Sequence, residues 1–189
     1  MEQLNQYKKL LLNWNKTHNL VSNSQALKLD DHIDDSLSIS QFLGNEIVDM
    51  GSGGGFPGLP LAIKNPTKKI HLVESNTKKA SFLLNTVNRL DLINTKVYNC
   101  RMEDLQPENF NPSLEIVTRA FGPISQIIKS SEHFLVFKNN TLKLMKTTHQ
   151  YEEDRLPEGY KETKREKILL KGKDKGRILV TIELNKNQM

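Results

Sequence analysis

The chain has 189 residues, of which 37% are hydrophobic and 26% charged, and its formal net charge is +5 at pH 7. This length suits one α/β domain with a substantial core and is short for two. The single cysteine excludes an internal disulfide, and the absence of any run of about 18 apolar residues excludes a membrane-spanning helix. The N-terminus also lacks the basic and apolar regions of a signal peptide, so we expect a cytoplasmic protein. The five histidines lack metal-ligand spacing, so we expect no metal.

The positive charge is concentrated at one end of the chain. Residues 1–137 contain 14 Lys and Arg against 14 Asp and Glu, whereas residues 138–189 contain 13 against 8, so the last quarter carries the whole surplus. A basic region beside a nearly neutral body suits a polyanionic partner such as RNA. A solvated, lysine-rich surface would give the same composition, so charge alone leaves both interpretations open.

The first predicted helix is amphipathic. Its apolar residues Leu4, Tyr7, Leu11 and Trp14 recur at three- and four-residue steps, which places them on one face. We expect this helix to cover the core and to bury its tryptophan there.

A second helical region follows, from a predicted cap at Ser24 to about Leu43. It contains four aspartates around one histidine, and paired carboxylates can serve acid–base chemistry or bind magnesium. At helical spacing, however, Asp31 and Asp35 share a face with Lys28. We therefore expect a solvated face or local capping there.

The most informative stretch is a glycine-rich loop that follows a short apolar run. Residues 47–50 predict a buried parallel strand, glycines dominate residues 51–55, and Pro57 suits the first turn of a helix. A strand that runs through glycines into a helix lets the backbone approach a ligand closely, with helix amides pointing at it. The arrangement indicates a loop that binds a nucleotide-type ligand.

Two ligand classes fit this loop. Residues 53–58 match the Gly-x-Gly-x-x-Gly spacing of dinucleotide-binding loops, which is a weak signal by itself. The segment Asp49-x-Gly51-x-Gly53-x-Gly resembles the acidic, glycine-rich loop of S-adenosylmethionine-dependent methyltransferases. Glu74 ends the next predicted strand, about where a carboxylate would accept both ribose hydroxyls. Because Gly51 follows its strand at once, the methyl-donor interpretation is favoured over a dinucleotide loop or a purely structural glycine turn.

Strands and helices alternate after residue 46, which is the pattern of a parallel sheet with helical crossovers. Strands are predicted at 47–50, 69–74, 96–99, 114–118 and 141–146, and helices at 57–64, 76–90 and 124–131. The second of these helices is expected to face the sheet with Ala80, Leu83, Leu84 and Val87. Residues 134–137 are apolar but of undetermined type. Strand candidates at 159–170 and 176–184 flank a Lys-Gly-Lys-Asp-Lys-Gly turn and predict an exposed hairpin.

The predicted fold is therefore α/β and Rossmann-like. It consists of a mostly parallel twisted sheet with a C-terminal antiparallel hairpin and an N-terminal helical extension. We expect one domain over residues 1–189, with the extension at 1–45 and the Rossmann-like core at 46–189. Ligands of open α/β sheets bind outside the carboxyl ends of the strands. The residues predicted to share one crevice there are Gly51–Phe56, Glu74, Met102–Glu103, Arg119 and Lys146.

Several segments together resemble one family, the small-subunit (16S) ribosomal RNA guanine-N7 methyltransferases, also called glucose-inhibited division protein B. The Gly-Phe-Pro-Gly-hydrophobic-Pro segment makes this resemblance specific, since it is unusual among methyltransferases. The N-terminus is short by family standards, and Thr147 stands where the family usually has glycine after a lysine. The matching segments are Asn19-Leu, His32-Ile-Asp-Asp-Ser-Leu37, Asp49-Met-Gly-Ser-Gly-Gly-Gly-Phe-Pro-Gly-Leu-Pro60, Glu74-Ser, Lys78-Lys79-x-x-Phe82-Leu83, Arg101-x-Glu103 and Thr118-Arg-Ala-Phe121.

The resemblance implies a class I methyltransferase that uses S-adenosyl-L-methionine and acts on N7 of a guanine in 16S rRNA, free or in the small ribosomal subunit. Gly51 and Phe56 would line the donor pocket. Met102 and Glu103 would lie beside the adenine, and Arg119 would contact the donor or the target. We expect a monomer. The alternatives are a methyltransferase for another RNA or a small molecule and, from a different class, a non-enzymatic RNA-binding module.

The chemistry of the target assigns further roles. Guanine N7 is an unprotonated lone pair, so no general base is required and catalysis can rest on orientation and electrostatics. Arg119 is expected to orient the guanine through O6 or a phosphate, with an ion pair to Glu103 as the alternative. Asp49 is expected to hold the glycine loop through its amides or to orient the donor's ammonium group through water. Cys100 is expected to be inert and partly buried.

Lysines near the strand ends are candidates for contacts to RNA phosphates. They are Lys78, Lys79 and Lys146, although lysines are more often simply solvated. A pair of Glu74 with Lys78 or Lys79 is the alternative to its binding of ribose. His32 and Ser36 are expected to support the loop rather than to act in catalysis.

Overall fold

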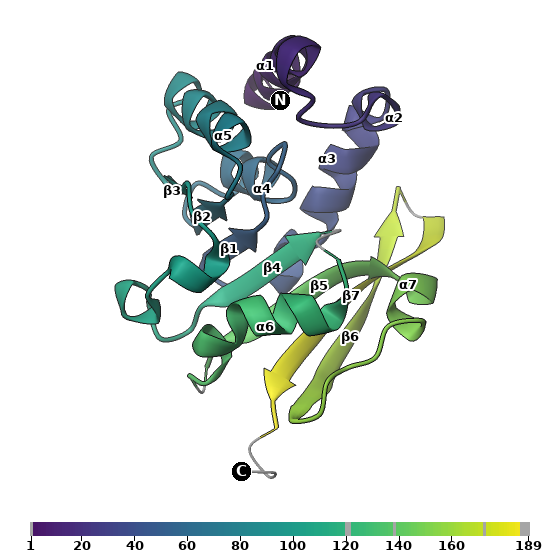
Figure 1. Cartoon of the computed structure of the whole chain (residues 1–189). Coiled ribbons are helices and arrows are strands. Elements are labelled where there is room, and N and C mark those ends of the chain that lie inside the picture. The colour runs from purple at the N-terminus through teal and green to yellow at the C-terminus, as the bar shows by residue number, and fades with distance from the viewer. Residues whose placement is uncertain (1, 120–121, 138, 172, 186–189) are drawn as a thin grey trace.

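The computed structural model describes residues 2–119, 122–137, 139–171 and 173–185. Ala120 and Phe121 of the family-like segment, and Gly172 of the predicted turn, lie outside the described residues. Within them, a seven-stranded sheet has the order β3-β2-β1-β4-β5-β7-β6 (Figure 1). The strands are β1 (Glu46–Met50), β2 (Lys69–Val73), β3 (Thr95–Tyr98), β4 (Glu115–Arg119), β5 (Thr141–Thr147), β6 (Tyr160–Leu170) and β7 (Lys173–Leu184).

The strand directions confirm the predicted fold class. Strands β1 to β5 pair in parallel, whereas β7 lies antiparallel between β5 and β6. The order in which strands are added to the sheet reverses at β1: β2 and β3 lie on one side of this strand, and β4 and β5 lie on the other. In an open α/β sheet, such a switch point opens a crevice at the carboxyl ends of the strands.

Helices cover both faces of the sheet (Figure 1). Alternate strand residues point to opposite faces, so Ile47 joins the core under α1, α3, α4 and α5, whereas Val48 joins the core under α6 and α7. The helices are α1 (Glu2–His18), α2 (Asn23–Ala26), α3 (Leu29–Ser38), α4 (Gly58–Lys64), α5 (Thr77–Arg89), α6 (Ile124–Leu135) and α7 (Thr148–Glu152). Single 3₁₀ turns occur at η1 (Ser40–Phe42), η2 (Met102–Asp104) and η3 (Pro107–Asn109).

The amphipathic pattern of α1 correctly predicted its buried face, with one exception. Leu4, Tyr7 and Leu11 are buried, but Trp14 is only half-buried. Its ring packs edge-on against Phe82 of α5, with 5.7 Å between the ring centroids. The expected burial of the tryptophan was therefore wrong in degree, because Trp14 lies near the end of the helix rather than over its middle.

The second helical region differs from its prediction at the cap. Ser22, not Ser24, caps it: the Ser22 hydroxyl accepts from the Gln25 amide at 3.2 Å, and the Gln25 side chain accepts from the Ser22 amide at 2.9 Å. The region divides into α2 and α3. Asp35, expected on a solvated face, is 5% exposed, because its side of α3 packs against arginines that come from far along the chain.

Three further predictions were wrong in detail. Leu84 is 52% exposed, and Phe82 takes its place in the core. The turn expected at 171–176 is shorter, because β7 begins at residue 173. The pairing of β6 with β7 shifts register between Ile168 and Leu169, and this shift leaves residues 175 and 176 of β7 without partners in β6. Helix α6 continues to Leu135 and so includes the start of the undetermined apolar stretch.

The start of α4 leaves no room for a side chain on the sheet side. A Cβ at Gly58 would lie 2.2 Å from Leu72 Cδ2 and 2.6 Å from Asp49 Oδ2. We predict that Gly58→Ala lowers the free energy of unfolding by about 1–3 kcal/mol, the usual cost of overpacking. Denaturant titration measures this change. The matched control is Gly44→Ala, whose Cβ would meet its nearest atom at 3.4 Å, and equal losses in both variants would contradict the prediction.

Candidate functional site

The glycine loop has the backbone conformation that its composition indicated. Gly51, Gly53 and Gly55 have φ values of 74°, 55° and 98°, which residues with a Cβ rarely adopt. The amides of Gly51 and Ser52 donate to the carbonyl of Val73 at 3.0 and 3.1 Å. The loop after β1 is therefore fixed to the end of the neighbouring strand β2.

Helix α1 holds the other side of this loop. The Tyr7 hydroxyl donates to the Gly54 carbonyl at 2.6 Å, and a Cβ at Gly54 would lie 2.8 Å from Val21 Cγ1. Burial raises the pKa of Tyr7 well above its usual value, so the hydroxyl stays protonated as a donor. The sequence pattern predicted Tyr7 only as a core residue, and no local signal revealed its contact with Gly54.

Asp49 lies beneath the loop and is fully buried. Its Oδ2 accepts from the Gly58 amide at 2.9 Å, while Oδ1 has no hydrogen-bond partner among the described residues. Burial raises the pKa of Asp49 to about 7, against the lowering effect of the Gly58 amide. Asp49 thus binds the amide of Gly58, the first residue of α4, rather than an amide of residues 51–55, and its expected role toward the donor's ammonium group stays a prediction.

Glu74 closes the loop from the end of β2. Its two carboxylate oxygens accept from the amides of Gly53, at 2.9 Å, and Asn76, at 2.8 Å. The alternative pair with Lys78 or Lys79 does not occur within the described residues. Each carboxylate oxygen has a second lone pair, so Glu74 can accept further hydrogen bonds from a bound ligand.

A cavity of about 340 Å³ lies beside Glu74 and the loop. Met102 is buried in its wall, and Glu103 lies at its edge, where it accepts from the Ser130 hydroxyl at 2.8 Å. Glu103 does not pair with Arg119, so that alternative was wrong. The cavity is lined by Met50, Gly51, Gly53, Val73, Glu74, Ser75, Lys79, Cys100, Arg101, Met102, Glu103, Gln126 and Ser130.

A second cavity, of about 210 Å³, adjoins the other side of the loop. Gly51, Gly53 and Lys79 line both cavities, whereas Phe56 and Arg119 line only the second of the two. The centroid of the Phe56 ring lies 5.6 Å from the centroid of the Tyr7 ring and 5.7 Å from Arg119 Cζ. Phe56 thus forms a wall between α1 and the arginine.

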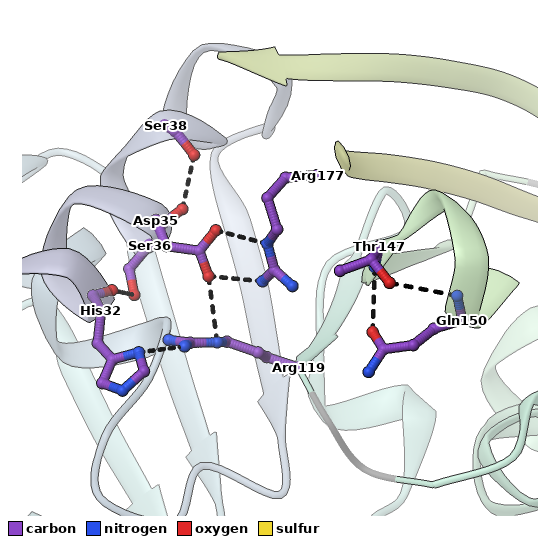
Figure 2. Close-up of polar contacts among 8 residues, drawn as sticks. All are labelled: His32, Asp35, Ser36, Ser38, Arg119, Thr147, Gln150 and Arg177. Carbon is purple, nitrogen blue, oxygen red and sulfur yellow. Dashed lines mark hydrogen bonds and ion pairs between the residues drawn. The ribbon is translucent and has the colours of Figure 1, made fainter. Parts of the chain in front are cut away.

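Arg119, at the end of β4, is held by two residues of α3 (Figure 2). Its Nε lies 3.2 Å from Asp35 Oδ2, and its Nη2 contacts His32 Nδ1. Burial, and then the nearby guanidinium, lower the pKa of His32, so the neutral imidazole can accept through Nδ1. Arg119 Nη1 is buried and has no hydrogen-bond partner among the described residues.

Lys146 lies in a third cavity, of about 560 Å³, between the ends of β4 and β5. Its Nζ lies 3.0 Å from Asp154 Oδ2 and donates to the Gly122 carbonyl at 3.3 Å. The next residue, Thr147, caps α7: its hydroxyl accepts from the Gln150 amide at 3.2 Å (Figure 2). Thr147 therefore has a structural role as the cap of α7, at the position where the resemblance led us to expect glycine.

The single predicted crevice is therefore divided into three adjoining cavities. The first and second share Gly51 and Gly53, and the second and third share Arg119. Of the two lysines at the start of α5, Lys79 lines the first and second cavities, whereas Lys78 is exposed and lines none of the three. Arg177, which sequence reasoning missed, lines the third.

Two classes of feature are absent from the part of the chain that the structure describes. No group of three or more His, Cys, Asp or Glu side chains is placed to hold a metal ion. No helix there has the length and apolar character needed to cross a membrane.

Solved structures share this fold. A SAM-dependent methyltransferase from Aquifex aeolicus superposes with a TM-score of 0.60 at 14% identity, over 91% of this chain and 98% of that one. M. jannaschii TYW2 in complex with AdoMet superposes with a TM-score of 0.52 at 15% identity, over 80% and 74%. At such identities the likeness shows the fold alone.

Sequence comparison is more specific. The family model for rRNA small subunit methyltransferase G (GidB) matches residues 1–177. The ribosomal RNA small subunit methyltransferase G of Chromobacterium violaceum is 37% identical over 97% of this chain and 88% of its own length. The ribosomal RNA small subunit methyltransferase G of Hydrogenovibrio crunogenus is 33% identical over 94% of this chain and 82% of its own length. The chain belongs to the rRNA small subunit methyltransferase G family.

Proposed function

We propose that this protein transfers the methyl group of S-adenosyl-L-methionine to N7 of a guanine in 16S ribosomal RNA, leaving 7-methylguanosine. The observation that carries the proposal is the pairing of the glycine loop with Glu74 beside the first cavity, in a chain of this family. The cytoplasm, where ribosomal subunits assemble, is the proposed location, and a monomer is the proposed state.

The donor is assigned to the first cavity. Glu74 would accept from the ribose hydroxyls through its remaining lone pairs, and Met102 would pack against the adenine. Gly51 and Gly53 let the backbone lie against the ligand without a Cβ between them. The methionyl end would then extend past the loop toward the second cavity, where Phe56 and Arg119 lie.

The target guanine is assigned to the third cavity, next to Arg119. Its volume of about 560 Å³ is larger than that of either neighbour, and its wall carries the cations Arg119, Lys146 and Arg177. Lys79, between the first two cavities, is the better placed of the α5 lysines for a phosphate contact, and Lys78 would act only at the outer surface.

The reaction needs orientation rather than proton transfer. S-adenosylmethionine supplies an electrophilic methyl carbon on its sulfonium. The N7 lone pair forms the new C–N bond while the C–S bond breaks, so the positive charge moves from sulfur to guanine and no proton has to leave. The protein's part is to align the two reactants and to exclude water, which can supply several powers of ten in rate. Arg119 would fix the base through O6 or a phosphate.

Ligand titration tests the donor assignment. We predict that calorimetry shows S-adenosylmethionine and S-adenosylhomocysteine binding in the micromolar range, and no binding of NAD. Gly53→Asp should abolish binding of S-adenosylmethionine and S-adenosylhomocysteine, because the backbone of Gly53 has a positive φ and its amide donates to the Glu74 carboxylate. Gly159→Asp is the matched control, since Gly159 also has a positive φ, 84°, with nothing within 4 Å of its Cβ position. Binding of NAD alone would contradict the donor assignment.

A second prediction concerns Arg119. Arg119→Ala should lower the rate of methyl transfer to 16S rRNA or small subunits on the order of 100-fold, while the donor dissociation constant changes little. Single-turnover transfer of radiolabelled methyl and donor titration are measured on the same preparations. Arg89→Ala, at the exposed end of α5, is the control arginine. Equal losses of transfer and donor binding would contradict an orienting role.

A further inference from the structure

One carboxylate on α3 is shared by two arginines from distant parts of the chain (Figure 2). Arg177 of β7 donates to Asp35 through Nε, at 2.9 Å, and Nη2, at 2.6 Å, so the two form a bidentate pair. Arg119 Nε approaches the same carboxylate at 3.2 Å. The cluster therefore ties α3, the end of β4 and β7 together at the boundary of the second and third cavities.

The charges of this cluster do not cancel. Two guanidiniums face one carboxylate, and the side chains of Asp35, Arg119 and Arg177 are 7%, 15% and 19% exposed. His32 accepts from Arg119 as a neutral ring and adds no negative charge. One positive charge is thus left over in a poorly solvated place, where it favours an incoming oxygen acceptor.

The guanidinium of Arg119 is fixed along one edge. Nε is bound to Asp35 and Nη2 to His32, so the plane of the group is set by two contacts from the same helix. Nη1 remains a buried donor that no described residue satisfies. An unsatisfied buried N–H is unfavourable for folding, so an oxygen acceptor that reached Nη1 would supply the missing hydrogen bond; His32 Nε2 is likewise without a partner among the described residues.

We propose that Asp35 is a positioning residue for methyl transfer: it holds Arg119 so that Nη1 meets an oxygen acceptor of the target nucleotide, and Arg177 holds Asp35 in place. This inference rests on the proposed function, since the acceptor belongs to the RNA. It also connects the C-terminal hairpin to the reaction, because Arg177 lies on β7.

The test compares two neighbouring aspartates. Asp35→Asn keeps the side-chain shape but removes the charge that attracts both arginines, and should lower single-turnover methyl transfer to 16S rRNA at least about 10-fold. The donor dissociation constant should stay within about twofold of wild type. Asp34→Asn, one residue earlier and paired with exposed Lys171 at 2.9 Å, should leave both quantities unchanged.

A double-variant cycle separates positioning from a general structural effect. If Asp35 acts through Arg119, adding Asp35→Asn to the Arg119→Ala variant should lower the rate of methyl transfer no further. Thermal melts check that each variant is folded. Multiplicative losses in the double variant, or an equal loss of donor binding, would overturn the proposal. Should Asp35→Asn fail to fold, Arg177→Met replaces it: a several-fold slower transfer with unchanged donor binding supports the proposal, and an unchanged rate overturns it.

The wild type reports on the function separately. If the wild type methylates 16S rRNA and Asp35→Asn does so at the same rate, the inference is overturned and the proposed function stands. Absence of transfer by the wild type, on free rRNA and on small subunits alike, would overturn the proposed function and the inference with it.

Discussion

The site depends on contacts that hold the glycine loop after β1, in which three glycines have positive φ and Ser52 has the only side chain beyond Cα. The loop has few ways to be rigid, because glycine loses more conformational freedom on folding than any other residue. The structure fixes it from three sides: the Val73 carbonyl binds two amides, Glu74 binds the Gly53 amide, and Tyr7 binds the Gly54 carbonyl. The first two contacts come from the end of β2 and the third from α1, so the loop is correct only when the sheet and α1 are both in place.

Glu74 has two roles in this site. In this structure its oxygens are bound to backbone amides, yet the geometry leaves lone pairs for a ligand. One side chain thus both orders the loop and completes the pocket. Replacement of Glu74 would therefore remove a contact that holds the loop as well as a carboxylate that lines the first cavity.

Electrostatics in this protein act locally. Several positive charges of residues 138–189 are paired within the hairpin, Arg165 with Glu162 and Lys167 with Asp174, and Lys171 pairs with Asp34 of α3. Exposed pairs of this kind contribute little to stability and are readily exchanged for other partners. The pairs at Arg119 and Arg177 differ, because they are poorly solvated and geometrically constrained.

The sequence by itself determined the fold class, the order of the strands along the chain and the residues of the glycine loop, but not the short helix α7 or the division between α2 and α3. These follow from local signals, namely apolar periodicity, glycines that need positive φ, and a carboxylate at a strand end. It also placed Phe56, Met102 and Arg119 near the site through the family resemblance. Helix caps were less certain, because Ser22 and Ser24 are both chemically able to cap α2, and only the backbone geometry selects one.

Only the tertiary structure decided which side chains meet. Tyr7 reaches Gly54 across 47 residues and Arg177 reaches Asp35 across 142, and no local pattern encodes such pairs. For the same reason Asp35 was expected in solvent: its helix face is polar, and the arginines that bury it come from two separate strands. Long-range packing turned a polar helix face into part of the site, because a buried charge is tolerated only where oppositely charged groups converge on it.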